Sequence, residues 1–324
     1  MTAPTTHHQR TTSTGSNLGE PRVGHALEVD HLTKRYGTNT VVDDLSFTVP
    51  PGRVTGFLGP NGSGKSTTMK IMLDLAAADA GTARIGGIRY RDLPDPARTV
   101  GAIIESDAFH PGRSGRNHLR ILAEATGIPA TRVDDMLEQV GLAGAADRRA
   151  GAYSLGMRQR LGLAAALLGA PPVLILDEPG NGLDPQGIRT LRDLLRAHAA
   201  AGGTVLVSSH LLAEVEHLAD DVIVINDGRL VTHGALAELQ QAASFVRTDD
   251  AGRLAALLED AGATTRTVGA TGLVVRGLST DEIGERAFIN GILLHELSPH
   301  AGSLEELFLT WTADTAATEE VIEL

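Results

Sequence analysis

Short segments in which apolar and polar positions alternate open the chain, and this pattern predicts strands. Residues 27–37 (LEVDHLTKRYG) and 41–59 (VVDDLSFTVPPGRVTGFLG) show it, with short polar turns between the segments. Apolar residues then recur at helical spacing in residues 67–76 (TTMKIMLDLA). Residues 83–90 (ARIGGIRY) and 99–106 (TVGAIIES) predict two more strands.

The pattern becomes helical from about residue 112 to residue 150, and beyond that helices and strands alternate. The alternating segments are a helix over 158–168, a strand over 173–176 (VLIL), a helix over 185–203, a strand over 204–209, a helix over 211–219 and a strand over 220–227. Pro185 opens the helix over 185–203, and Gly202 and Gly203 close it. Alternation of this kind predicts an α/β fold with a mainly parallel sheet covered on both faces.

The two ends of the chain differ in character from residues 26–240. Residues 1–25 are polar and lack an apolar core, so they predict a disordered tail and not a secretory signal. His7 and His8 in this tail could bind a metal, but such a pair is more often incidental. Residues 241–324 predict a small α/β accessory domain, whose closing helix starts at Ser303 with Glu306 as its capping-box partner.

Composition narrows the class of protein. The chain has 324 residues, of which 42% are hydrophobic, so it can bury one or two proper cores. Its net charge of -12 argues against a general nucleic-acid binder, and the lack of cysteine excludes disulfides and thiol chemistry. The longest apolar run is broken by Pro171 and Pro172, which makes it too short to span a membrane. We therefore expect a soluble chain that needs an embedded partner if it serves a membrane process.

The stretch GPNGSGKST, residues 59–67, matches the pattern G-x-x-x-x-G-K-[ST] between a predicted strand and a predicted helix. Such a loop directs backbone N–H groups at phosphate oxygens, and the start of the helix adds partial positive charge. Lys65 would reach the β- and γ-phosphates, and Ser66 would ligand magnesium. A purely structural glycine turn is the alternative. The residues predicted to bind ATP here are Gly59, Pro60, Asn61, Gly62, Ser63, Gly64, Lys65, Ser66 and Thr67.

Two adjacent carboxylates follow the predicted strand VLIL. Asp177 and Glu178 would lie at its carboxyl end, where ligands bind in open parallel sheets. The pair can divide its work, with Asp177 holding magnesium and Glu178 acting as the general base on the attacking water. Alone, such a pair is more often a helix cap. Its position about 110 residues after a phosphate loop favours the catalytic interpretation.

In their order and spacing these motifs resemble the nucleotide-binding subunit of an ATP-binding cassette transporter, over residues 26–240. YSLGMRQRLGLAAAL (153–167) matches the family signature, which is usually close to LSGGQ, and GNGLDP (180–185) matches the D-loop with Asp184. VSSHLLAEVE (207–216) contains His210 at the position of the switch histidine. KRYG (34–37) contains Tyr36, which would stack on adenine. Singly, each has an ordinary explanation, as surface packing, a helix cap or a turn. The resemblance implies a P-loop NTPase-type sheet with an antiparallel β subdomain and a helical subdomain at about residues 105–165.

The signature of this family binds a nucleotide held by a second subunit. Ser154 and Gly156 are expected at the start of a helix, where a hydroxyl, amide protons and the helix dipole face one anion. The resemblance identifies that anion as the γ-phosphate of ATP on the other chain, which implies a head-to-tail homodimer. Leu155 and Met157 depart from the usual glycine and glutamine. Because Ser154 and Gly156 are retained, we expect an active site.

Another departure is Glu105, at the position where most members of the family carry a glutamine. Ionised glutamate only accepts hydrogen bonds and adds negative charge, which a magnesium ion would tolerate nearby. The resemblance therefore implies that Glu105 is a third magnesium ligand, beside Ser66 and Asp177. Together with SLGM in the signature and the closing SLEELFLTWT (303–312), it resembles the branch that exports antibiotics, including bacitracin-type and lantibiotic exporters. Neutral drift is the alternative for Glu105.

These features predict an ATP-hydrolysing subunit that powers an exporter of antibiotics, peptides or other drugs through a separate permease. The chain would be cytoplasmic and peripheral on the inner face of the membrane, and Phe109, His110 and Arg113 would face the permease. The alternative is an ATP-driven factor in translation or DNA repair. Such factors usually carry two cassettes or long coiled coils, whereas about 90 residues separate the two motifs of this single cassette. A regulator that binds ATP without hydrolysis is a third alternative, which Glu178 and His210 oppose.

Overall fold

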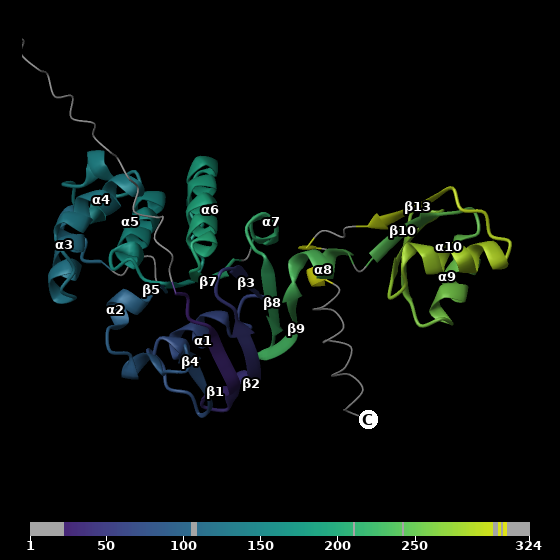
Figure 1. Ribbon diagram of the computed structural model, residues 1–324, viewed down its shortest axis with the longest axis horizontal. Coiled ribbons are helices and arrows are strands. Elements are labelled where there is room, and N and C mark those ends of the chain that lie inside the picture. The colour runs from purple at the N-terminus through teal and green to yellow at the C-terminus, as the bar shows by residue number, and fades with distance from the viewer. Residues whose placement is uncertain are drawn as a thin grey trace, which may run out of the picture.

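A computed structural model of the protein describes residues 23–104, 109–209, 211–241, 243–300, 304–305 and 307–309 (Figure 1). Its centre is a six-stranded sheet with the order β5-β6-β7-β3-β8-β9. The strands are β5 (Val100–Ile103), β6 (Val173–Leu176), β7 (Thr204–Ser208), β3 (Val54–Leu58), β8 (Asp221–Asn226) and β9 (Arg229–Ala235). All neighbours pair in parallel except β8 and β9, which are antiparallel. The prediction of a mainly parallel sheet is confirmed.

Both faces of this sheet are covered, as the continuous apolar runs of β3, β6 and β7 require. Leu174 and Leu176 of β6 pack into a core formed with α5 (Leu155–Leu167) and α6 (Pro185–Ala200). Val173 and Ile175 point the other way, into a core shared with α1 (Lys65–Met72). Alternate residues of one strand therefore serve two separate cores, because successive side chains point to opposite faces.

A three-stranded antiparallel sheet packs over the core on the α1 side. Its order is β2-β1-β4, with β1 (Leu27–Tyr36), β2 (Asn39–Val49) and β4 (Ala80–Ile85). The strand predicted over residues 83–90 is wrong in its extent, because β4 ends at Ile85. Gly86 and Gly87 have φ values of 57° and 79°, which turn the chain out of the strand, and residues 90–92 form a short 3₁₀ turn.

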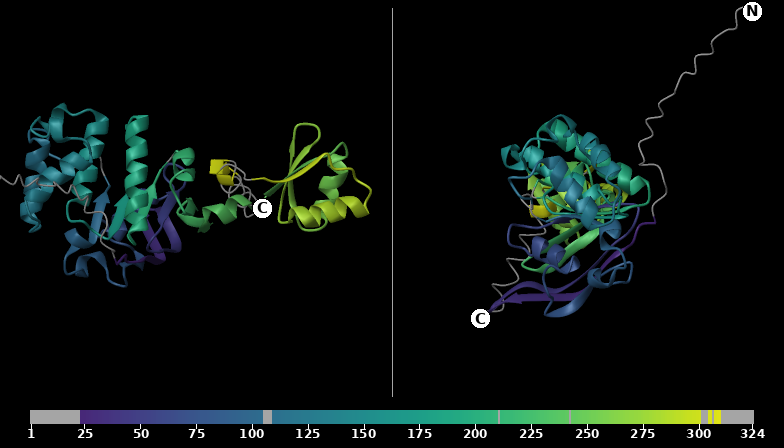
Figure 2. Two further views of the ribbon diagram at one scale, coloured as in Figure 1. Left: turned by 45° about the horizontal axis from the view of Figure 1, so that its top comes forward. Right: turned by 90° about the vertical axis from the view of Figure 1, so that its left-hand side faces the viewer.

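The predicted helical part contains α3 (Gly115–Ala125), α4 (Thr131–Gln139) and α5, which group at one end of the molecule (Figures 1 and 2). The side chains of Ser114 and Ser154 cap α3 and α5, since each accepts a hydrogen bond from the N–H three residues on. Three shorter helices, α2 (Pro96–Thr99), α7 (Leu212–Glu216) and α8 (Leu236–Gln241), connect the remaining strands. Among the described residues, no helix is long and apolar enough to cross a membrane.

Residues 243–300 form a second sheet with its own core. The order is β11-β12-β10-β13 with antiparallel pairing throughout, in a β-α-β-β-α-β chain order. The elements are β10 (Ala243–Arg247), α9 (Ala251–Glu259), β11 (Thr264–Val268), β12 (Gly272–Arg276), α10 (Thr280–Ile289) and β13 (Glu296–His300). A capping box joins Ser279 and Glu282 at the start of α10. The box predicted at Ser303 and Glu306 lies outside the described residues.

Beyond this second sheet the chain returns to the main one. Leu304 is fully buried in a cluster with Leu58, Val215 and Val224. Its N–H donates a hydrogen bond of 3.3 Å to the Glu216 carboxylate at the end of α7. The described end of the chain thus packs against the helix that follows position 210.

Candidate functional site

The predicted phosphate loop lies between β3 and α1, at the carboxyl edge of the main sheet. Gly64 precedes the helix with φ of 100°, and a Cβ on it would lie 2.6 Å from the Val41 carbonyl oxygen. A Cβ on Gly59 would collide with the Ile225 carbonyl and the Ser63 hydroxyl. Only glycine fits at either position. The first turn of α1 leaves backbone N–H groups without helical acceptors, which can bind an anion at this end of the helix.

Lys65, the first residue of α1, is buried against the loop. Its Nζ donates hydrogen bonds of 2.6 Å and 2.9 Å to the carbonyl oxygens of Gly59 and Pro60. Burial lowers the pKa of its ammonium group, and the nearby carboxylates of Glu178 and Asp177 oppose that shift. A cation held over the loop, close to the acidic pair, is suited to bind phosphate oxygens.

Asp177 and Glu178 directly follow β6, so the parallel pairing β6-β7-β3 brings the acidic pair, the end of β7 and the loop to one edge. The hydroxyl of Ser208, the last residue of β7, accepts a 2.9 Å bond from the Glu178 N–H. It also donates a 2.5 Å bond to Oδ1 of Asp177. Our sequence reasoning missed Ser208, because only the pairing of β6 with β7 shows which hydroxyl bridges the two acids.

The prediction that Ser154 and Gly156 lie at the start of a helix is confirmed. Ser154 is the N-cap of α5, and a Cβ on Gly156 would lie 2.8 Å from the carbonyl oxygen of Gly182. Leu155 is 47% exposed and packs over Gly182, so this departure from the family pattern covers the predicted D-loop. Among the described residues, no hydrogen bond or ion pair joins Ser154 or Gly156 to residues 59–67.

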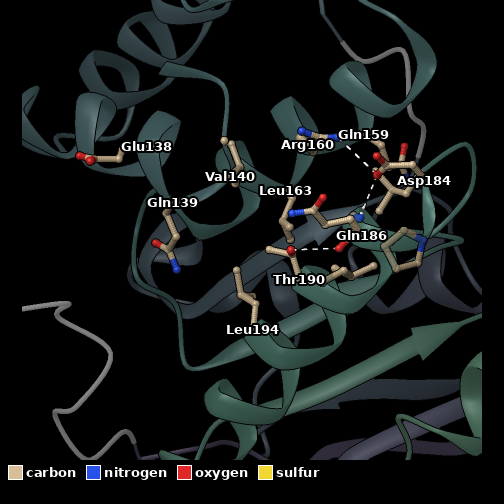
Figure 3. Close-up of a pocket in the computed structure, with 15 residues that line it drawn as sticks. Glu138, Gln139, Val140, Gln159, Arg160, Leu163, Asp184, Gln186, Thr190 and Leu194 are labelled. Carbon is tan, nitrogen blue, oxygen red and sulfur yellow. Dashed lines mark hydrogen bonds and ion pairs between the residues drawn. The ribbon is translucent and has the colours of Figure 1, made fainter. Parts of the chain in front are cut away.

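Asp184 has partners within its own chain. Its carboxylate caps α6 through a 2.8 Å bond from the Gly187 N–H and lies 3.6 Å from the Arg160 guanidinium. Asp184 and Arg160 line a cavity of about 340 Å³ between α4, α5 and α6 (Figure 3). The assignment of Asp184 to ATP binding therefore stays a prediction.

Of the remaining predicted residues, the structure describes Tyr36 and does not describe His210 or Glu105. Tyr36 ends β1 with 54% of its surface exposed, and Lys34 Nζ lies 5.0 Å from its ring centroid. An exposed ring can stack on a base. His210 and Glu105 lie outside the described residues, as does the pair His7 and His8.

The donor set at the loop suits a small divalent cation. Ser66 is exposed at the start of α1, and Asp177 is half-buried at the end of β6. Hydroxyl and carboxylate oxygens, completed by phosphate and water, are the ligands that Mg²⁺ prefers. Within the described part of the chain, no group of three or more His, Cys, Asp or Glu residues could hold a metal. Because Ser66 and Asp177 supply only part of a coordination sphere, a Mg²⁺ here would take its other ligands from phosphate and water.

Comparison with known proteins places the chain in a family. Residues 42–181 match the family described as "ABC transporter", and residues 244–305 match a "Domain of unknown function (DUF8746)". The chain is 38% identical over 293 residues to "Bacitracin transport ATP-binding protein BcrA" of Enterococcus faecalis, covering 88% of this chain and 95% of that protein. It is 38% identical over 207 residues to "Lantibiotic transport ATP-binding protein SrtF" of Streptococcus pyogenes, covering 63% of this chain and 89% of that protein.

Solved structures show the same relationship. The chain aligns with a "Structure of ATP binding subunit of ABC transporter" at a TM-score of 0.62 and 28% identity, covering 81% of this chain and 99% of that one. The phosphate loop, the acidic pair and the signature helix all lie within the matched family region. The chain therefore belongs to the ATP-binding subunits of ABC transporters, an ATPase family, in the branch that includes the bacitracin and lantibiotic transport proteins.

Proposed function

We propose that this chain is the motor of an ABC exporter, which drives efflux of an antibiotic, peptide or other drug through a separate permease. The observation that carries this is the separation of two phosphate-binding features. Among the described residues, no hydrogen bond or ion pair joins the loop of residues 59–67 to Ser154 or Gly156 at the start of α5. Two copies arranged head to tail would complete both sites, each loop facing the other chain's helix start.

Within such a dimer the residues have distinct roles in hydrolysis. Lys65 would exchange its bonds to the loop carbonyls for oxygens of the β- and γ-phosphates. Glu178 would accept a proton from the attacking water. The water oxygen would bond to the γ-phosphorus while the bond from the γ-phosphorus to the β-phosphate oxygen breaks. Mg²⁺ bound by Ser66 and Asp177, with Glu105 as the further ligand we expect, would neutralise charge on the phosphates. His210 would stabilise the γ-phosphate, and Tyr36 would stack on adenine.

A surface groove offers a place for the permease. It has a volume of about 590 Å³ and lies between α1, β5 and α3, and its apolar lining includes Leu73, Leu75, Phe109 and Leu122. Leu75 is 66% exposed and adjoins the other apolar side chains of the groove, and an exposed apolar patch of this kind marks an interaction site. Such a groove fits the apolar face of an amphipathic helix from a cytoplasmic loop of the permease.

Two further predicted residues lie beside this groove. His110 and Arg113 are exposed on the turn that leads from Phe109 into α3. They would offer polar contacts at its rim. Docking there would hold the chain at the inner face of the membrane, although the chain itself stays in the cytoplasm. The transported molecule would then contact the permease.

The alternative of a translation or DNA-repair factor has little support. The relatives reported above are named as transport proteins, and the net charge of -12 disfavours a nucleic-acid partner. The two functions predict different partners, which makes them separable in one experiment.

That experiment is purification of the tagged full-length chain from detergent-solubilised membranes of its own host. We expect a co-purifying protein with about six hydrophobic spans that stimulates ATP hydrolysis when both are reconstituted in vesicles. Recovery with ribosomes or DNA, or without any membrane protein, would contradict the proposal. The same purification with Lys65→Ala is the control, because it should retain the partner and lose the stimulated hydrolysis.

A further inference from the structure

We propose that Gln159 is a positioning residue for ATP hydrolysis, which acts by holding the backbone of Glu178. This inference rests on the proposed role of Glu178 as the general base. Gln159 lies in the second turn of α5 and is only 3% exposed. Its Nε2 donates a 2.9 Å hydrogen bond to the main-chain carbonyl of Glu178.

Glu178 needs such support because its backbone is strained. Its φ is 50°, in the left-handed region that a residue with a Cβ adopts at a cost of about 1–2 kcal/mol. Conformations of this kind persist only where the surrounding structure holds them. The Ser208 hydroxyl binds the Glu178 N–H at 2.9 Å, while Gln159 binds its carbonyl. The Asn181 N–H also donates to that carbonyl, at 3.2 Å, and closes the turn after it.

The bond from Gln159 has a fixed direction. The Glu178 carbonyl can only accept, so the amide must present Nε2 to it and turn Oε1 away. Among the described residues, Oε1 of Gln159 is buried without a hydrogen-bond partner. A buried polar atom left unpaired costs about 1–3 kcal/mol. An apolar side chain of equal length would avoid this cost, so packing alone does not explain a glutamine at this position.

The position of Gln159 also links two parts of the site. It lies on the same rigid helix as Ser154 and Gly156, about 7.5 Å along the axis from Ser154 at the normal rise per residue. In the proposed dimer that helix start meets the nucleotide of the other subunit. A shift of α5 on engaging that nucleotide would therefore reach the Glu178 carbonyl of the same chain directly.

The test measures ATP hydrolysis by the full-length chain with its permease. Gln159→Met keeps the length of the side chain and removes the donor, and Gln159→Glu places an acceptor against the carbonyl. We expect kcat to fall about 10- to 100-fold in both variants, because a base displaced by about 1 Å loses rate on this scale. The KM for ATP should stay within about threefold, because no contact to phosphate changes. Gln139→Met is the control, since Gln139 lies across the cavity from Gln159 (Figure 3).

A double-mutant cycle separates positioning from a general effect on structure. If Gln159 acts through Glu178, Gln159→Met should cause no further loss in a Glu178→Gln background. An equal loss in both backgrounds, or unchanged kcat in both Gln159 variants, would overturn the proposal. Normal turnover in Glu178→Gln alone would instead remove the base itself, so the two failures can be told apart. Thermal unfolding midpoints and nucleotide binding identify any variant that is misfolded, and Gln159→Glu then serves in place of Gln159→Met.

Discussion

The hydroxyl of Ser208 donates a 2.5 Å hydrogen bond to the carboxylate of Asp177, across the pairing of β7 with β6. The same oxygen accepts the N–H of Glu178. One fully buried hydroxyl thus orients both members of the acidic pair.

Ser208→Ala should therefore remove the hydrogen bonds that orient Asp177 and Glu178. The Glu178 N–H would lose its acceptor, which should lower the free energy of unfolding by about 1–3 kcal/mol. We expect kcat to fall about tenfold and the Mg²⁺ concentration for half-maximal activity to rise, as measured in ATPase titrations. Ser244→Ala in β10 is the matched control, because it removes a buried strand serine from the other sheet. An unchanged Mg²⁺ titration for Ser208→Ala would contradict the role of the hydroxyl.

Glu178→Gln should trap the ATP-bound dimer, since the amide cannot take the proton of the attacking water. We expect hydrolysis to fall at least about 100-fold while ATP still binds. Size-exclusion chromatography with light scattering, with and without ATP and Mg²⁺, measures the dimer. Glu285→Gln on α10 makes the same chemical change away from the site and should hydrolyse ATP normally. Monomers at saturating ATP, for the isolated chain and in the permease complex, would contradict the shared site.

Leu75→Asp should uncouple the chain from its permease. The side chain is exposed in the groove, so a carboxylate there should leave the fold intact and oppose docking of an apolar helix. We expect basal ATPase activity to stay within about twofold and stimulation by the permease to be lost. Leu293→Asp places the same charge on a leucine that is 71% exposed beyond α10, and it should keep the stimulation. Full stimulation in Leu75→Asp would place the permease elsewhere.

His118 in α3 should make stability sensitive to acid. Burial, with a smaller contribution from Arg113, lowers its pKa below the ordinary value of 6.5. The unfolded chain therefore takes up a proton first as pH falls below about 6.5, and stability drops until the pKa of the folded state is passed. Comparing thermal midpoints at pH 7.5 and 5.5, we expect a smaller drop for His118→Gln than for the natural chain. Equal drops would show that His118 stays uncharged in both states or charges equally in both.

Leu304→Ala should release the end of the chain from α7. Removing a fully buried leucine costs about 2–5 kcal/mol, and this one packs against Val215 of α7. We expect a lower thermal midpoint and faster protease cleavage after residue 300. ATPase activity should also fall, because α7 begins at Leu212, two residues after His210. Leu309→Ala, at an exposed leucine of the same segment, should stay within about 0.5 kcal/mol. Equal effects of the two substitutions would contradict the docking.

Sequence patterns predicted most of the main sheet, because its strands are short apolar runs between turn residues. They placed β4 too far along the chain and missed β9 and α8 over residues 229–241. Residues 229–235 are only partly buried, so their apolar alternation is weak. Their strand conformation comes from antiparallel pairing with β8, which is a contact between neighbours and not a property of the segment.

Residue order alone supports predictions about chemistry that depends on neighbours in the chain. The glycines, Lys65 and Ser66 are contiguous, and Asp177 with Glu178 directly follows a buried strand, so the nucleotide site could be predicted locally. Contacts between distant segments needed the folded chain. Strand pairing decides that Ser208 bridges the acids, and helix packing decides that Gln159 reaches Glu178 and Leu304 reaches α7. Such contacts depend on the register and orientation of elements many residues apart, and no local spacing encodes either.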